Sequence, residues 1–343
     1  MGLQISEIVT KKEITIESLK GKTLAVDAFN VIYQFLSTIR QPDGTPLQDS
    51  KGRITSHLSG LFYRNISLLQ EGIKLIYVFD GKPPELKKAT REKREGIKDE
   101  AQEKYEQAKE NEDVEGMGKY ARQVVHLDKE KIEESKQLLR AMGIAVVQAP
   151  SEGEAQASYI TKTNSDVYAI ASQDYDCLLF EAPKLIQNLT LAKKRKTVSG
   201  YVEVTPQLIE LRGVLKELEI NQEQLICIGI LCGTDYNPGG VKGIGQKKAL
   251  KFVKEHKTPE KIFEALDKLV EEGKYKVEFD WKEIFELMKN PSVDKTPKIE
   301  FGKFSFDKVK DIMISHDFSE ERINSQFEKI RELNEQKKQR TLF

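Results

Sequence analysis

The sequence predicts an α/β fold with a central, mostly parallel sheet flanked by helices, and three observations lead to it. Short, nearly continuous apolar runs recur along the chain, as in the buried strands of parallel sheets. Segments with helical periodicity separate these runs. The chain has 343 residues, of which 38% are hydrophobic, so it can bury a sizeable core.

Four apolar runs predict strands, and an acidic residue ends each run or follows it closely. The runs are 23–27, 74–80, 144–147 and 166–171. Helices are expected directly after Asp27, over 54–71, and from the N-cap residue Ser151 to Thr163. Parallel sheets of this kind bind ligands outside the carboxyl ends of their strands. We therefore expect the functional site at that edge.

Two further segments have a distinct character. Residues 85–122 are dense in Lys, Arg, Glu and Gln, which predicts helix without a wide apolar stripe. That composition suits a solvated helical hairpin held by ion pairs, and it also suits a mobile basic arch over an active site. Beyond it, helices over 222–231 and from Gln246 flank a glycine-rich turn.

The bulk composition limits the class of protein. The 55 basic and 55 acidic residues cancel, whereas nucleic-acid binders are usually basic, although a net sum hides local patches. No apolar run approaches the roughly 20 residues of a membrane helix, and the N-terminus lacks a signal-peptide pattern. Three cysteines fit neither a disulfide framework nor a zinc ribbon, which favours a reducing intracellular compartment.

Seven acidic residues share one context, because each ends an apolar element or lies in the turn after one. They are Asp27, Asp80, Glu152, Glu154, Asp174, Asp176 and Asp235. Any single one is explained as an N-cap or turn residue, but seven at one predicted edge favour a metal site. Crowded carboxylates raise one another's pKa unless a cation neutralises them. Oxygen ligands, in a chain with four histidines, favour magnesium or manganese over zinc.

A cluster of this size suits two metal ions about 4 Å apart, the arrangement used for in-line phosphodiester cleavage. Such a site activates water and stabilises the leaving oxygen, so no side-chain nucleophile is required. The residues alone therefore predict a magnesium-dependent phosphodiesterase.

The glycine-rich turn predicts a phosphate contact of the helix-hairpin-helix type. Gly243 and Gly245 let backbone approach a phosphate, and Lys247 and Lys248 add charge at the start of the next helix. Glycine turns between helices are common, so the signal depends on these lysines and on Asp235. Two other patterns fail. Gly21-Lys22-Thr23 has Ile16 where a P-loop needs glycine, and Phe29 stands where a haloacid dehalogenase needs its second aspartate.

Six segments, in this order and at similar spacing, resemble the flap endonuclease family over residues 1 to about 260. They are VDAFNVIYQFL, SHLSGLFYRN, YVFDGKPPELK, APSEGEAQASY, ASQDYDCLLF and LCGTDYNPGGVKGIGQKKAL. The resemblance implies a saddle-shaped α/β nuclease with a helical arch. It also implies removal of 5′ flaps during DNA replication (Okazaki fragment maturation) and repair, with 5′-3′ exonuclease activity, leaving a 5′ phosphate and a 3′ hydroxyl.

The resemblance also implies roles for residues near the cut. The seven acidic residues match ligands of two Mg²⁺ ions, some acting through water, and Mn²⁺ is expected to substitute. Lys87 and Arg94 match basic residues that contact the scissile phosphate. Tyr33 matches an aromatic residue that stacks on a base.

Other matched positions imply contacts with the rest of the DNA. Arg40 and Arg64 match basic positions near the junction, and Gly2 matches a residue that lies near the site once methionine is removed. The turn from Gly243 to Lys248 matches one that grips downstream duplex with a bound K⁺ ion.

By the same resemblance the chain divides into an N-terminal nuclease region (1–98), the rest of the arch (99–125), an internal nuclease region (126–260) and a C-terminal region (261–343). Family members commonly end in a motif that binds the sliding clamp, proliferating cell nuclear antigen. Gln339 to Leu342 fit the first half of this motif, and the sequence ends at Phe343 without the pair of aromatic residues that closes the motif. We expect a clamp-binding monomer. The eukaryotic basic tail is missing, which favours an archaeal, cytoplasmic, chromosome-associated protein over a nuclear one.

Two alternative functions agree less well with the sequence. Another member of the 5′ nuclease superfamily, such as a junction resolvase or a bubble-incising repair nuclease, usually carries long insertions, which a chain of 343 residues argues against. A non-catalytic DNA-binding scaffold predicts missing ligands, yet all seven acidic residues are present.

Overall fold

The computed structural model describes residues 3–41, 44–111, 113, 116, 119–120, 124, 126–190, 194–197 and 200–340. Its centre is a seven-stranded sheet of order β1-β9-β6-β5-β2-β3-β4. The strands are β1 (Lys12–Glu13), β2 (Thr23–Asp27), β3 (Lys74–Phe79), β4 (Ala145–Gln148), β5 (Val167–Ala171), β6 (Lys184–Gln187) and β9 (Gln207–Glu210). The five strands from β4 to β6 are parallel, and only β9 and β1 pair antiparallel. The predicted mostly parallel sheet is confirmed.

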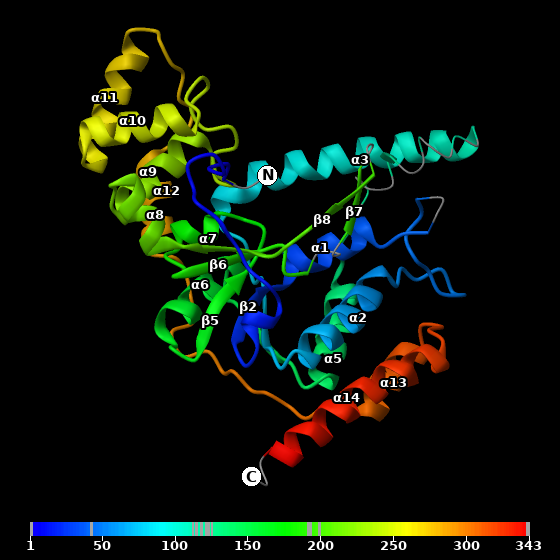
Figure 1. Ribbon diagram of the computed structural model, residues 1–343. Coiled ribbons are helices and arrows are strands. Elements are labelled where there is room, and N and C mark those ends of the chain that lie inside the picture. Colours follow the sequence, from blue (N-terminus) through cyan, green and yellow to red (C-terminus); the bar gives the residue numbers. More distant parts are fainter. Residues whose placement is uncertain are drawn as a thin grey trace.

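Helices cover both faces of this sheet (Figure 1). One layer holds α1 (Ala28–Thr38), α2 (Ser56–Gln70), α5 (Lys129–Ala141), α13 (Phe306–Ile314) and α14 (Glu320–Arg340). The other holds α6 (Gly153–Thr163), α7 (Asp176–Leu179), α8 (Leu211–Leu218), α9 (Gln222–Cys232), α10 (Gln246–His256), α11 (Pro259–Glu271) and α12 (Trp281–Lys289). Successive side chains of a strand point to opposite faces of the sheet, so each strand contributes to the cores on both faces. In β2, Leu24 and Val26 lie in one core and Ala25 lies in the other.

Helix α3 (Lys88–Glu110) follows the 3-10 turn η2 (Glu85–Lys87) and lies outside both layers (Figure 1). Most of the described side chains in its first half are exposed, and Ala101 is one of its few buried residues. The prediction of a helix without a wide apolar stripe is therefore confirmed for 88–110. Much of 112–125, the rest of the predicted arch, lies outside the described residues.

Smaller expectations need correction. The helix expected from an N-cap at Ser151 begins one residue later, with Glu152 as its N-cap. Strands β7 (Lys194–Thr197) and β8 (Gly200–Glu203) form a hairpin that was not predicted. Another 3-10 turn, η1 (Glu17–Leu19), precedes β2.

Among the described residues, no helix is long and apolar enough to cross a membrane.

The C-terminal helices are anchored to the body of the protein. In α14, Ile323, Phe327 and Ile330 are buried at the spacing of one helical face, and the Phe327 ring centroid lies 6.4 Å from that of Phe62 in α2. The first half of α14 therefore belongs to the core, although its composition resembles a charged surface segment.

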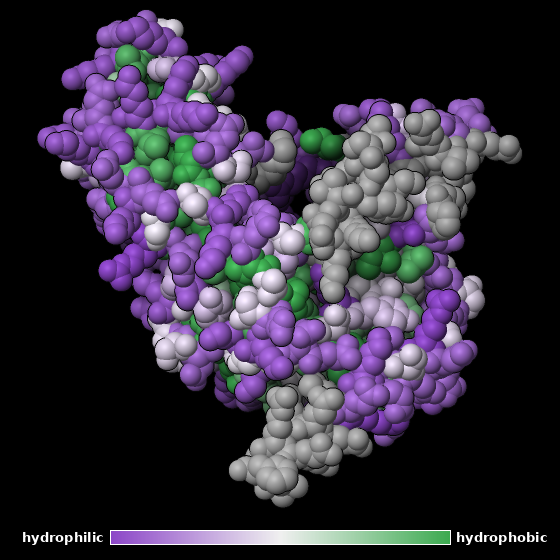
Figure 2. All heavy atoms as spheres, in the orientation of Figure 1, coloured by the Kyte–Doolittle hydropathy of each residue, from purple (hydrophilic) through white to green (hydrophobic). Residues whose placement is uncertain are grey.

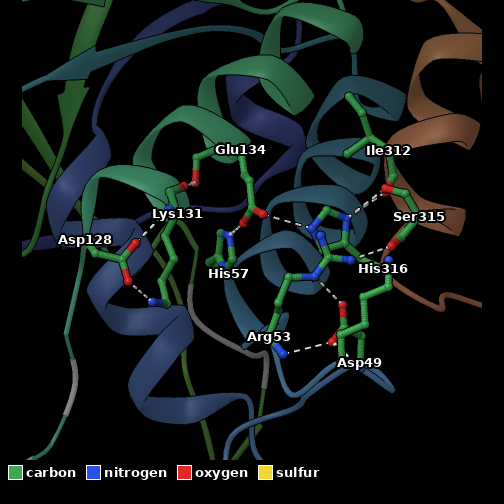
Figure 3. Close-up of polar contacts among 11 residues, drawn as sticks. Asp49, Arg53, His57, Asp128, Lys131, Glu134, Ile312, Ser315 and His316 are labelled. Carbon is green, nitrogen blue, oxygen red and sulfur yellow. Dashed lines mark hydrogen bonds and ion pairs between the residues drawn. The ribbon is translucent and has the colours of Figure 1, made fainter.

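A carboxylate fastens the same C-terminal unit from the other side. Glu134 of α5 lies 3.1 Å from His57 Nε2 in α2 and 2.9 Å from His316 Nε2, just beyond α13 (Figure 3). The Nδ1 atom of His316 lies 2.9 Å from the Ile312 carbonyl oxygen. Both ring nitrogens of His316 therefore lie within hydrogen-bond distance of an oxygen atom, and the ring ties α13 to α5. Partial burial acts against the charge of Glu134, but the two histidines lower its pKa.

We predict that Glu134→Ala lowers the free energy of unfolding by about 3 kcal/mol, because it leaves two buried imidazoles without their acceptor. Urea denaturation followed by circular dichroism measures the change. Glu133→Ala is the matched control, since the Glu133 carboxylate is exposed and pairs with Lys136 on the surface. Equal stability of the two variants would contradict the bridging role.

Candidate active site

The predicted acidic residues meet at the carboxyl edge of three adjacent parallel strands. Asp27 is the last residue of β2 and the N-cap of α1, where it accepts from Asn30 N at 3.1 Å. Asp80 directly follows β3, and Asp174 lies three residues beyond β5. Because β3, β2 and β5 are neighbours, these three carboxylates converge on one side of the sheet.

Two glycines bring a second group of acids beside the first. Gly81 N donates to the Ser151 carbonyl oxygen at 2.6 Å, and Gly153 N donates to the Asp80 carboxylate. A Cβ atom at Gly81 would lie 2.2 Å from the Ala149 carbonyl oxygen, so only glycine fits this crossing. Glu152 and Glu154, which flank Gly153 at the start of α6, are thereby held next to Asp80.

The tightest part of the cluster is Glu154, Asp174 and Asp176. Their ligand atoms all lie within 4.8 Å of one another. Asp176 N donates to Asp174 Oδ1 at 3.2 Å, and Leu3 N donates to Asp176 Oδ1 at 3.3 Å. Gly2, expected near the site, lies outside the described residues, but its neighbour Leu3 reaches the cluster.

Burial and mutual repulsion raise the pKa of these carboxyl groups. Burial, followed by the charge of Asp80, raises the pKa of Asp27 to about 7. The pKa of Glu154 rises well above its usual value through burial and then through Asp174. Asp80, Glu152, Asp174 and Asp176 shift the same way, with burial as the largest cause. A hard divalent cation would relieve both effects, and this all-oxygen donor set fits one.

Two cations contact the acids from the foot of α3, which comprises the turn η2 with Lys87 and the first two turns of the helix with Arg94. Lys87 Nζ contacts Glu152 Oε1 and lies 3.8 Å from Asp235 Oδ2, while Arg94 Nη2 lies 2.6 Å from Asp235 Oδ1. Burial opposes the charge of Lys87, but the acids, Glu152 foremost, raise its pKa overall. Asp235 lies after α9, so these contacts join the arch, the sheet edge and the loop beyond α9.

The structure places the other predicted residues at varied distances from the acids. Tyr33 of α1 is 36% exposed, with Lys98 Nζ 5.2 Å from its ring centroid, and its electrostatic neighbours include Arg94 and Asp80. Arg40 instead holds its own loop, because its guanidinium donates to the Ser37 and Gly44 carbonyl oxygens at 2.9 and 3.0 Å.

Arg64 also contacts backbone, donating from Nη2 to the Leu189 carbonyl oxygen at 3.1 Å. The glycine-rich turn lies between α9 and α10. Gly243 has φ of 92°, Gly245 is the N-cap of α10, and Lys248 Nζ donates to the Gly243 carbonyl oxygen at 3.0 Å. Lys247 pairs with Glu7 at 3.2 Å on the surface.

Figure 2 shows this face of the protein as mostly hydrophilic, and hollowed between the lobe of α10 and α11 and the side that carries α3. The contacts described above put the predicted site residues in more than one region of the structure. The acids, Lys87, Arg94 and Tyr33 come together, whereas the glycine turn belongs to the lobe.

Two residues near the acids were not predicted. Ser172 Oγ donates to Asp27 Oδ2 at 3.1 Å and accepts from Asp174 N at 3.2 Å. Its place between β5 and Asp174 was the available signal. Thr90 Oγ1 donates to the Asp235 carbonyl oxygen at 2.9 Å, and nothing in the charged sequence around it distinguishes it.

Comparisons with known proteins agree with this arrangement. The family patterns described as the XPG N-terminal domain and the XPG I-region match residues 2–101 and 143–235. Flap endonuclease 1 of Pyrococcus furiosus is 50% identical over 345 residues, covering 100% of this chain and 98% of that protein. The same four values hold for flap endonuclease 1 of Thermococcus onnurineus.

Solved structures share the fold. Flap endonuclease-1 from Methanococcus jannaschii matches with a TM-score of 0.75 and 41% identity, over 98% of this chain and 100% of that chain. The catalytic core of Rad2 in complex with DNA substrate matches with a TM-score of 0.68 and 23% identity, over 94% and 96%. Because relatives half identical to it match along its whole length, this chain belongs to the flap endonuclease family.

Proposed function

We propose that this protein is a structure-specific endonuclease that removes 5′ flaps from branched DNA, with 5′-3′ exonuclease activity, during replication (Okazaki fragment maturation) and repair. The observation that carries the proposal is the convergence of the acidic cluster with Lys87 and Arg94. This convergence occurs in a chain half identical to proteins named flap endonuclease 1. The reaction is phosphodiester hydrolysis, which leaves a 5′ phosphate and a 3′ hydroxyl.

The seven acids are proposed to hold two Mg²⁺ ions, with Mn²⁺ as a substitute. Glu154, Asp174 and Asp176 form the most compact ligand set, while Asp27, Asp80, Glu152 and Asp235 complete the cluster. When bound, the ions would supply an activated water and neutralise charge on the phosphate and the leaving oxygen. The repulsion that raises the carboxyl pKa values supports this assignment, since it disappears once the acids bind cations.

The protein's own cations prepare the site for a phosphate. Before DNA arrives, Lys87 and Arg94 pair with Glu152 and Asp235. Once metal ions neutralise those carboxylates, the same two side chains are available to a phosphate oxygen at the mouth of the cluster. Tyr33, partly exposed beside them, is proposed to stack on the base next to the cut.

Contacts farther away are proposed to select the shape of the DNA. The backbone of Gly243 and Gly245, with Lys247, Lys248 and a K⁺ ion, would grip phosphates of the downstream duplex. Arg40 and Arg64 are assigned to the junction, and Gly2 is assigned to the DNA near the acidic cluster, where it becomes the N-terminus once methionine is removed. Arg40 and Arg64 would act at the junction chiefly by fixing the backbone that approaches the DNA, because each donates to main-chain carbonyls.

The remaining assignments follow the family. We propose a monomer, chromosome-associated in an archaeal cytoplasm, that binds the sliding clamp through Gln339–Phe343; residues 341–343 lie outside the described part. The division into 1–98, 99–125, 126–260 and 261–343 is proposed to separate the N-terminal nuclease region, the remainder of the arch, the internal nuclease region, and the C-terminal region with the clamp-binding tail.

We predict that Asp174→Ala lowers flap cleavage by several orders of magnitude while DNA binding persists, because a ligand is removed from the centre of the cluster. Single-turnover cleavage and fluorescence anisotropy measure the two properties. Asp166→Ala is the matched control, since Asp166 is exposed and directly precedes β5, at the end of the strand opposite Asp174. Cleavage by Asp174→Ala at the control's rate would refute the metal-site assignment.

Substrate choice is tested with 5′-labelled double-flap, nicked, bubble and four-way junction DNAs. The double flap should be cut fastest, and only when Mg²⁺ or Mn²⁺ is present, because hydrolysis depends on the ions held by the acids. Excess EDTA should abolish cutting. Equal or faster cutting of bubbles or junctions would instead favour a repair nuclease or a resolvase.

Clamp binding is tested at the tail. Gln339→Ala should weaken binding to proliferating cell nuclear antigen at least tenfold in calorimetry, since it removes the polar anchor of the motif. Gln336→Ala, three residues earlier, is the matched control and should bind like the unmodified protein. Unchanged affinity of Gln339→Ala would show that the tail is not the clamp contact.

A further inference from the structure

Three residues at the foot of α3 converge on a single residue outside it. Thr90 and Arg94 are four positions apart in α3 and share one face of the helix, and Lys87 is the last residue of the turn η2 directly before it. Lys87 and Arg94 approach the Asp235 carboxylate, and Thr90 Oγ1 donates to its main-chain carbonyl oxygen at 2.9 Å. Thr90 is 8% exposed, so water has little access to this hydroxyl.

The three contacts differ in what becomes of them when metal ions arrive. Those of Lys87 and Arg94 end on the Asp235 carboxylate, which the proposed function assigns to a metal ion. The Thr90 hydroxyl instead donates to the main-chain carbonyl oxygen of Asp235. This oxygen stays in place when the Asp235 carboxylate exchanges its cationic side chains for a metal ion. The Thr90 contact is therefore compatible with both states of the site.

The far side of the contact is rigid. The Asn237 side chain accepts from Thr234 N at 3.1 Å and from Thr234 Oγ1 at 2.8 Å, and it donates to the Ile230 carbonyl oxygen at 2.7 Å. A Cβ atom at Gly233 would lie 2.5 Å from Gly240 N, which shows how closely the two ends of this loop approach. Of the two partners, the exposed α3 has far less packing to hold it than the braced loop.

We propose that Thr90 is a positioning residue that keeps the foot of α3 in register with the Asp235 loop, so that Lys87 and Arg94 stay aimed at the acidic cluster after they release their carboxylates. The inference rests on the proposed function for the roles of Lys87, Arg94 and Asp235. Thr90 itself touches neither the reacting phosphate nor an ion. It acts through the helix that carries the two cations.

Four variants of the full-length protein test the proposal. Thr90→Val removes the donor at nearly constant volume. Thr90→Ala removes the same donor but favours helix more than threonine does, so a loosened α3 in this variant cannot come from helix propensity. Thr90→Ser keeps the hydroxyl. Thr163→Val is the matched control, because the Thr163 hydroxyl bonds a carbonyl oxygen of its own helix on the exposed end of α6.

The first readout is hydrogen exchange of residues 88–96, measured by mass spectrometry without DNA, in EDTA and in Mg²⁺. Loss of one buried hydrogen bond should speed exchange about tenfold in Thr90→Val and Thr90→Ala. Thr90→Ser and Thr163→Val should match the unmodified protein in both buffers. Protection that is the same in all five proteins, or lost equally in Thr90→Ser, overturns the proposal.

The second readout separates positioning from general damage. Single-turnover cleavage of a double flap at saturating enzyme should fall about tenfold in Thr90→Val, while the dissociation constant for DNA stays within about twofold. Thr90→Ser should restore the rate. A Thr90→Val variant that cuts at the unmodified rate overturns the proposal. If the unmodified protein cuts no flap at all, the proposed function fails, and the exchange comparison still decides whether Thr90 holds α3.

Discussion

The structure depends on one electrostatic constraint, the burial of several carboxylates at one edge of a sheet. Such groups repel each other and lose solvation, and both effects favour protonation over charge. The pKa of Asp27, raised to about 7, records that tension. Local hydrogen-bond donors partly offset this cost. Gly153 N donates to Asp80, Ser172 Oγ donates to Asp27, and Leu3 N donates to Asp176.

The same constraint links the arch to the site. The negative charge of the cluster attracts positively charged side chains, and Lys87 and Arg94 pair with its carboxylates. The position of the foot of α3 is therefore partly set by the charge of the acids. An ion that neutralises the acids also changes what the two side chains do, which makes arch and cluster a single electrostatic unit.

Much of this could be predicted from the sequence, because the decisive signals are local. A buried parallel strand is a short apolar run, and an acid at its end falls at the carboxyl edge whatever surrounds it. Asp27, Asp80 and Asp174 were found in this way. The family resemblance then implied the roles proposed for Lys87 and Arg94, which a charged helical segment alone does not indicate.

What escaped prediction depends on contacts between distant residues. The bond from Thr90 to Asp235 spans 145 positions and that from His316 to Glu134 spans 182, so neither leaves a local pattern. The antiparallel β9 is short and only partly apolar, and β1 consists of two charged residues. In α14 the buried spacing of Ile323, Phe327 and Ile330 was hidden by the charged residues around it.

The anchoring of α14 has a mechanical consequence. In Figure 1 this helix leaves the body on the side away from α3, while its first half is fixed to α2 by aromatic packing and to α5, through α13, by Glu134. The outer end of α14 is therefore carried by a segment that packs into the core. A partner that bound this outer end would contact the protein on the side away from α3, and the acidic cluster would stay accessible to DNA.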